Sequence, residues 1–244
     1  MKATNSKKRV KRTNFNNVGY FAIALLVISI LGFWPSYFSK FFDGTDDFNF
    51  YYHFHLAIAL MWIALLIVQP FLIKQKKVAL HKRIGKLSYI ILPLLIISVI
   101  LLKHSTTHVE KISGLGASLW FVIKHSVIIL VMFTIAMRYS KNMQIHARAM
   151  IAIGIEFLEP GWARFIYSTL LPEPNFYLGL SISVTTMYAL VFYLIIKERN
   201  QSSGRWVFPL YLVMSILFHF LIFYEISFDF LDSFAAWFYK LPIT

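Results

Sequence analysis

The chain has 244 residues, of which 58% are hydrophobic and only 14% are charged. A soluble domain carries about 25% charged residues, so this composition excludes an ordinary soluble fold and favours a protein embedded in a lipid bilayer. The net charge of +13 does not indicate nucleic-acid binding, because the basic residues form short clusters between long apolar runs. The absence of cysteine excludes disulfides, thiolate metal sites and cysteine nucleophiles.

The first 17 residues form a basic tail, which we expect on the cytoplasmic side. The apolar run that follows is too long for the core of a signal peptide and lacks a small-residue cleavage site, so an uncleaved first span is expected. A helix needs about 20 apolar residues to cross the hydrocarbon core. Seven segments within a transmembrane domain at 18–226 meet this need, namely about 18–37, 51–73, 84–102, 117–137, 149–171, 176–196 and 206–226.

The charges in the loops predict the orientation of this all-α, polytopic bundle. With the N-terminus inside and the C-terminus outside, the inner segments hold 18 of the 24 Lys and Arg residues. This asymmetry follows the positive-inside rule and supports an odd number of spans. We therefore expect a multi-pass membrane protein. The remaining 227–244 segment is rich in aromatic residues and predicts an amphipathic helix on the outer surface, with a disordered tail as the alternative.

Few ionisable side chains fall inside the predicted spans. Because such groups cost about 2.5–3.5 kcal/mol to insert, they usually face the bundle interior and often mark function. Glu156, Glu159 and Arg164 lie in one span around Pro160, where an ion pair or a proton or metal site are both open. Pro160 with Gly161 predicts a kink in that helix. The complete set is His55, Lys124, His125, Glu156, Glu159, Arg164 and His219.

Histidine placement is the most informative feature of the sequence. His53, His55, His104, His108, His125 and His219 fall in the outer half or outer loops, whereas His81 and His146 fall at the inner face. His53 and His55 diverge on a helix, and the deeper His55 is expected to point inward. For His219 a simple hydrogen bond to a neighbouring helix is the alternative, whereas His53 has the alternative of an interfacial position. His81 and His146 have the alternative of binding lipid headgroups.

Four of these histidines form a pattern that resembles a known family. His55 and His125 pair toward the outside, and His81 and His146 pair toward the inside, over about 51–171. This arrangement resembles the ascorbate-dependent, six-helix, di-haem b-type cytochromes, in which four central helices hold two haems between histidines. The resemblance implies haem b as cofactor and electron transfer across the membrane, with quinone or a redox protein as partner.

A second resemblance rests on local sequence motifs. After a histidine near the start of a span come Gln69-Pro70, then His81-x-Arg83-x-Gly85, then His146-x-Arg148-x-Met150. These motifs resemble a family of uncharacterised bacterial integral membrane proteins. That resemblance implies the bacterial cytoplasmic membrane as the location but no established activity.

Two other functions remain open from the sequence. The first is a zinc- or iron-dependent membrane hydrolase or metal-handling protein, resembling in topology the seven-span hydrolases of the ceramidase and adiponectin-receptor type. It departs from them in its last span, where only His219 appears. The second is a cofactor-free assembly or structural subunit. The metal site of the first would be drawn from His55, His104, His108, His125, Glu156 and Glu159.

Overall fold

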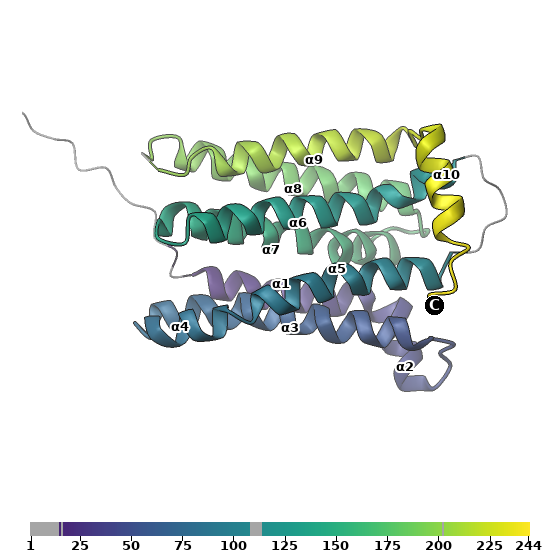
Figure 1. The fold of residues 1–244 in the computed structure, drawn as a ribbon, viewed down its shortest axis with the longest axis horizontal. Helices are drawn as coiled ribbons and strands as arrows, with labels where there is room; N and C mark the ends of the chain where they lie inside the picture. Colours follow the sequence, from purple (N-terminus) through teal and green to yellow (C-terminus); the bar gives the residue numbers. More distant parts are fainter. Residues whose placement is uncertain (1–14, 16, 108–113, 202) are drawn as a thin grey trace, which may run out of the picture.

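The computed structural model describes residues 15, 17–107, 114–201 and 203–244, and these residues form a helical bundle without strands (Figure 1). The long helices are α1 (Val18–Phe33), α3 (Phe50–Lys74), α5 (Ser88–Ser105), α6 (Trp120–Arg138), α7 (Met143–Phe165), α8 (Phe176–Glu198) and α9 (Val207–Phe223). The short elements are η1 (Trp34–Phe38), α2 (Ser39–Asp43), α4 (Val78–Gly85), η2 (Leu115–Leu119), η3 (Ile166–Leu170) and α10 (Asp229–Phe238).

Five helical segments of the described chain are long and apolar enough to cross a membrane. This confirms a multi-span membrane protein but gives fewer spans than the seven predicted. α7 is long but carries four charged side chains, and α9 is apolar but only 17 residues long. The five segments are Val18–Asp43, Phe50–Lys74, Val78–Ser105, Leu115–Arg138 and Phe176–Glu198.

The long helices lie side by side, and their connections gather at two ends (Figure 1). One end, here called the α4 end, holds α4 and the loops that follow α6 and α8. The opposite end, here called the α10 end, holds α2 and α10. The loops at the α4 end are rich in Lys and Arg, whereas 43–47 and 225–232 at the α10 end are rich in acidic residues. The two ends of the bundle therefore differ in charge.

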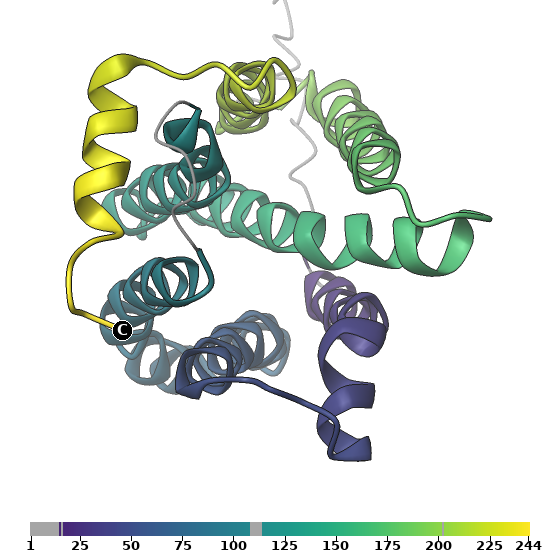
Figure 2. The ribbon, with the colours of Figure 1, turned by 90° about the vertical axis from the view of Figure 1, so that its right-hand side faces the viewer.

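Viewed along the bundle, α3 and α5 form one pair, and α6 and α7 form another (Figure 2). α1 packs against both α3 and α7, while α8 and α9 cover the far side of α7 and α6. An aromatic layer links the two pairs midway, because the buried Trp62 of α3 lies 6.1 Å from the Phe133 ring of α6 and 6.3 Å from the Phe157 ring of α7, between centroids.

The contact between α1 and α7 depends on glycine. A Cβ added at Gly32 would lie 2.0 Å from the backbone oxygen of Gly161, and one added at Gly161 would lie 2.9 Å from the Cα of Ser29. Small residues let helix backbones approach closely, which is a common way to hold helices together in lipid. The Pro160–Gly161 step, predicted only as a kink, therefore serves as the packing surface for α1.

α10 closes the α10 end of the bundle, where the sequence predicts an amphipathic helix. Its buried Leu231 and Ala235 pack on η2, and Asp232 accepts hydrogen bonds from the Ser227 hydroxyl (2.6 Å) and the Gly116 N–H (2.7 Å). A third hydrogen bond comes from the Gly114 N–H (3.1 Å). The Ser227 bond first, and the backbone bonds after it, hold the pKa of Asp232 below its usual value.

Candidate functional site

The most buried polar group in the bundle is an ion cluster between α6 and α7. Lys124 Nζ lies 2.9 Å from Glu156 Oε1 and 2.5 Å from Glu159 Oε2. The exposed fractions of the three side chains are 0%, 0% and 1%. Residues three apart on a helix share a face, so the sequence of α7 presents both carboxylates to the same ammonium group.

Side chains from three further positions complete the cluster. The hydroxyl of Tyr211 on α9 donates to Glu156 Oε2 at 3.0 Å. His125, next to Lys124 on α6, places Nδ1 2.6 Å from Glu156 Oε1, and His219 on α9 places Nε2 3.1 Å from Glu159 Oε2. The hydroxyl of Tyr188 on α8 lies 2.7 Å from His219 Nδ1. With Tyr188 included, four helices contribute side chains to the cluster.

Glu159 and Arg164, which are close enough in sequence for an ion pair, do not pair in the structure. The Arg164 guanidinium donates to the Pro160 backbone oxygen (3.1 Å) and covers the Phe33 ring of α1 at 4.5 Å. Arg164 is five positions from Glu159, which turns it toward α1, whereas Glu159 faces α6. The cation that neutralises Glu159 is Lys124, from a different helix.

At the α4 end, the structure brings His81 and His146 together. Their ring centroids are 6.3 Å apart, and the ring planes are nearly perpendicular at 80°. His146 Nδ1 lies 2.9 Å from the backbone oxygen of Ala136, in the last turn of α6. A carbonyl oxygen only accepts, so His146 carries its proton on Nδ1 and its lone pair on Nε2. No described residue hydrogen-bonds to Nε2 of either ring.

Gln69 hydrogen-bonds to the His81 ring of this pair. The side-chain oxygen of Gln69 accepts from the Gly85 N–H (3.1 Å), and its amide nitrogen lies 3.1 Å from the His81 backbone oxygen and 2.5 Å from His81 Nδ1. With the amide in this orientation His81 Nδ1 accepts, and the ring proton sits on Nε2. The opposite tautomer has an acceptor as well, because the Gln69 backbone oxygen lies 3.4 Å from Nδ1.

His55 points into the bundle, whereas His53 does not. His55 Nδ1 lies 2.9 Å from the Ser98 hydroxyl of α5, which itself donates to the Leu95 backbone oxygen at 2.8 Å. The Ser98 oxygen therefore accepts from His55 Nδ1–H, and the lone pair of His55 lies on Nε2. His53 instead hydrogen-bonds to the Tyr37 hydroxyl at 2.5 Å, among aromatic rings at the α10 end.

The predicted zinc or iron site is not assembled in the part of the chain that the structure describes. Among these residues, no three histidine or carboxylate side chains lie together as metal ligands would. Both ring nitrogens of His104 bind the C-terminal segment, Nδ1 to Thr244 Oγ1 (2.5 Å) and Nε2 to the Phe238 backbone oxygen (3.0 Å). α5 ends at Ser105, and His108 lies outside the described residues.

Free space lies beside the face of α7 that carries His146. A Cβ added at Gly154, two turns from His146, would meet no atom within 4 Å. A Cβ at Gly85 would touch only the Gln69 amide, at 3.8 Å. The indole N–H of Trp62 has no hydrogen-bond partner among the described residues, although it is buried. Neither Gly85 nor Gly154 is therefore required by a close contact at its Cα.

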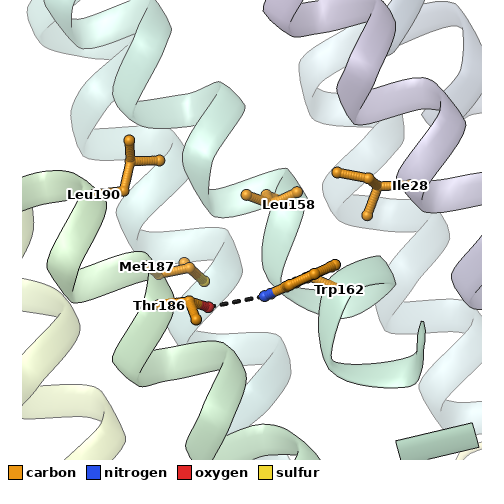
Figure 3. A pocket seen from close by; sticks show the side chains of 6 residues that line it. All are labelled: Ile28, Leu158, Trp162, Thr186, Met187 and Leu190. Carbon is orange, nitrogen blue, oxygen red and sulfur yellow. Dashed lines mark hydrogen bonds between the residues drawn. The ribbon is translucent and has the colours of Figure 1, made fainter. Parts of the chain in front are cut away.

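A separate hollow lies away from all of these groups, between α1, α7 and α8 (Figure 3). Its volume is about 210 Å³, and its polar contact is the 2.8 Å hydrogen bond from Trp162 Nε1 to Thr186 Oγ1. No ionisable side chain lines it, so it offers no site for acid–base chemistry. The lining residues are Ile28, Leu158, Trp162, Thr186, Met187 and Leu190.

No protein-family model, curated protein or solved structure matches this chain. These comparisons therefore assign the chain to no family. The sequence singled out Lys124, His125, Glu156 and Glu159 but gave no signal for Tyr188 or Tyr211. Tyrosine is common in membrane helices, and only contact with the carboxylate or with His219 distinguishes these two.

Proposed function

We propose that this integral membrane protein binds haem b between His81 and His146 and passes electrons to or from a quinone or a redox protein. The observation that carries the proposal is the neighbouring pair of rings, whose centroids are 6.3 Å apart, with no described partner on either Nε2. When bound, haem supplies one-electron redox chemistry, whose potential depends on its axial ligands and on burial.

The donor set of the pair fits such a ligand. His81 and His146 would hold the haem through their imidazole Nε2 atoms, and neutral imidazole nitrogen is a common ligand of haem iron. Metal-binding histidines generally donate their other N–H to a carbonyl or carboxylate, as His146 does to Ala136. His81 fits in the tautomer that donates to the Gln69 backbone oxygen. Lys82 and Arg83 add positive charge on the same segment, which suits the propionates of haem.

The outer pair of the four-histidine pattern is left out of this proposal. His125 already hydrogen-bonds to Glu156 within the ion cluster, and that carboxylate is also bound by Lys124 and Tyr211. Nε2 of His55 has no hydrogen-bond partner in the part of the chain that the structure describes, and a second haem held by His55 and His125 stays a prediction from the sequence.

The test is a reduced-minus-oxidised visible spectrum of protein purified in mild detergent. We expect sharp b-type bands that are lost in His81→Ala and His146→Ala and kept in His125→Ala. His53→Ala, which removes a histidine at the α10 end, is the matched control. Bands that survive His146→Ala but vanish in His55→Ala would move the site to the outer pair. Absence of haem from folded wild-type protein would favour the cofactor-free subunit.

We further propose that α7 and α9 also cross the membrane, with the α4 end and the N-terminus in the cytoplasm of a bacterium and α10 outside. The support is the excess of Lys and Arg at the α4 end. The lack of cysteine makes the test simple, because Gln75→Cys and Thr45→Cys would each introduce the single thiol of the protein at an exposed site. An impermeant maleimide added to intact cells should label position 45 and not position 75. The reverse pattern would invert the topology.

A further inference from the structure

The ion cluster does not balance its charge by itself. Lys124 contributes one positive charge, while Glu156 and Glu159 contribute two negative charges. All three side chains are essentially inaccessible, and a net charge kept out of water in a membrane bundle costs several kcal/mol. Neutrality therefore requires one more proton, and the side chains in contact with the carboxylates that take up a proton most readily are His125 and His219.

The geometry favours His125 over His219. His125 Nδ1 already donates to Glu156 Oε1 at 2.6 Å, and its Nε2 points toward Glu159 Oε1 at 4.0 Å. That Glu159 oxygen is buried and has no hydrogen-bond partner among the described residues. A proton on Nε2 would give the orphan oxygen its missing donor after a movement of about 1 Å. His219, in contrast, already has a partner at both ring nitrogens, Tyr188 and Glu159.

Access also favours His125. Its side chain is 19% exposed, whereas the exposed fraction of Lys124, Glu156, Glu159 and His219 is 3% or less. The ring therefore forms the edge of the cluster through which a proton can enter and leave. The carboxylates behind it are sealed by α9.

The other ionisable groups around His125 do not supply the missing positive charge within the cluster. His55 of α3 lies within electrostatic range, and its Nδ1–H is committed to Ser98. Arg164 faces Phe33 of α1. Tyr211 of α9 and Tyr188 of α8 are neutral in their hydrogen-bonded form.

We propose that the cluster is a proton-binding site that holds one exchangeable proton on His125, between Glu156 and Glu159. This proton sits on His125 Nε2 and exchanges through the exposed edge of the ring. Lys124 stays charged and holds the two carboxylates in place. This function goes beyond the proposed haem site, which involves other residues at the other end of the bundle, so either proposal can fail without the other.

The test is infrared spectroscopy of lipid-reconstituted protein with isotope-labelled histidine, titrated from pH 5 to pH 9. The wild type minus His125→Gln difference should contain one imidazolium band that rises as pH falls. Glu159→Gln removes the excess negative charge, so this band should fall about tenfold at pH 7.5, where an imidazole of ordinary pKa is about one-tenth protonated. The double variant Lys124→Met/Glu159→Gln restores the charge of −1 and should restore the band.

Glu198→Gln is the matched control, because Glu198 is a buried carboxylate paired with Arg148 at the α4 end. It should leave the His125 band unchanged. A band of wild-type size in Glu159→Gln would overturn the proposal, as would the same imidazolium band in His125→Gln, which would assign the proton to His219. If Glu159→Gln does not fold, the double variant and His125→Gln still decide, because loss of the band in a folded, charge-matched double variant also contradicts the proposal.

Discussion

The two polar regions of the bundle are built in opposite ways. In the ion cluster nearly every polar atom is matched by another side chain, and the members come from four helices. In the histidine pair at the α4 end, each ring is anchored through Nδ1, and the other nitrogen has no partner among the described residues. A cluster whose polar atoms are nearly all paired holds helices together, whereas ring nitrogens without a partner suit the binding of a metal-centred ligand.

Burial alone therefore does not identify a ligand site. Lys124 and Glu156 are fully buried charges, yet both already form hydrogen bonds with other side chains of the cluster. His81 and His146 are only half-buried, and Nε2 of each ring has no hydrogen-bond partner among the described residues. The following predictions test this contrast, beginning with the largest effect.

Removal of the central cation should be the most damaging change. Lys124→Met leaves two carboxylates buried without their partner, which should lower the free energy of unfolding by about 3–5 kcal/mol. His146→Leu removes one hydrogen bond, to Ala136, and should cost only about 1 kcal/mol. Equilibrium unfolding in mixed micelles measures both values. Equal losses for the two variants would erase the distinction between the regions.

The hydroxyl of Tyr211 should matter less than Lys124 but remain measurable. Tyr211→Phe deletes the 3.0 Å hydrogen bond to Glu156 Oε2, and bonds to charged groups contribute about 1.5–3 kcal/mol. The control is Tyr193→Phe on the exposed face of α8, which should change stability by about 0.5 kcal/mol or less. Thermal unfolding of the two variants measures this difference. Coinciding unfolding curves would mean that the cluster tolerates the loss of the Tyr211 hydroxyl.

At the α4 end, the predicted effect is on ligand retention. Gln69→Glu replaces the amide by a carboxylate that accepts from both Gly85 N–H and His81 Nδ1–H, which favours the tautomer with a free Nε2. Changes of this kind alter affinity by about tenfold, so haem should transfer to apomyoglobin about tenfold more slowly. Gln75→Glu adds the same charge at an exposed position nearby and should have no effect. Faster haem loss in Gln69→Glu would contradict haem binding by His81 in the tautomer that donates from Nδ1.

The smallest effect is expected at α10. The folded state lowers the pKa of Asp232, so this carboxylate stabilises the α10 contact above its unfolded pKa of about 4 and loses that contribution as pH falls further. Asp232→Asn at pH 7 should imitate the acid state and increase deuterium uptake in 114–119 and 227–238. Asp229→Asn is exposed on the same helix and serves as the control. Unchanged uptake in Asp232→Asn would mean that apolar packing alone holds α10.

Some of the fold and of the site could be predicted from individual segments. The apolar runs and the basic loops predict a multi-span helical protein, because a bilayer imposes its thickness on each run separately. The third predicted span begins at 84, but the structure divides that region into α4 and α5 around Lys86 and Leu87. Such a break depends on local backbone geometry, which hydrophobicity does not encode.

The sequence by itself determined the membrane class, the approximate helices and the short set of ionisable residues from which any site must be drawn. Only the tertiary structure decided which of them meet. In the structure Glu159 pairs with Lys124 and not with Arg164. His81 lies beside His146, and His104 hydrogen-bonds to the C-terminal segment. The reason is physical: spacing along one helix fixes which face a side chain occupies, but its partner is set by how separate helices rotate and pack.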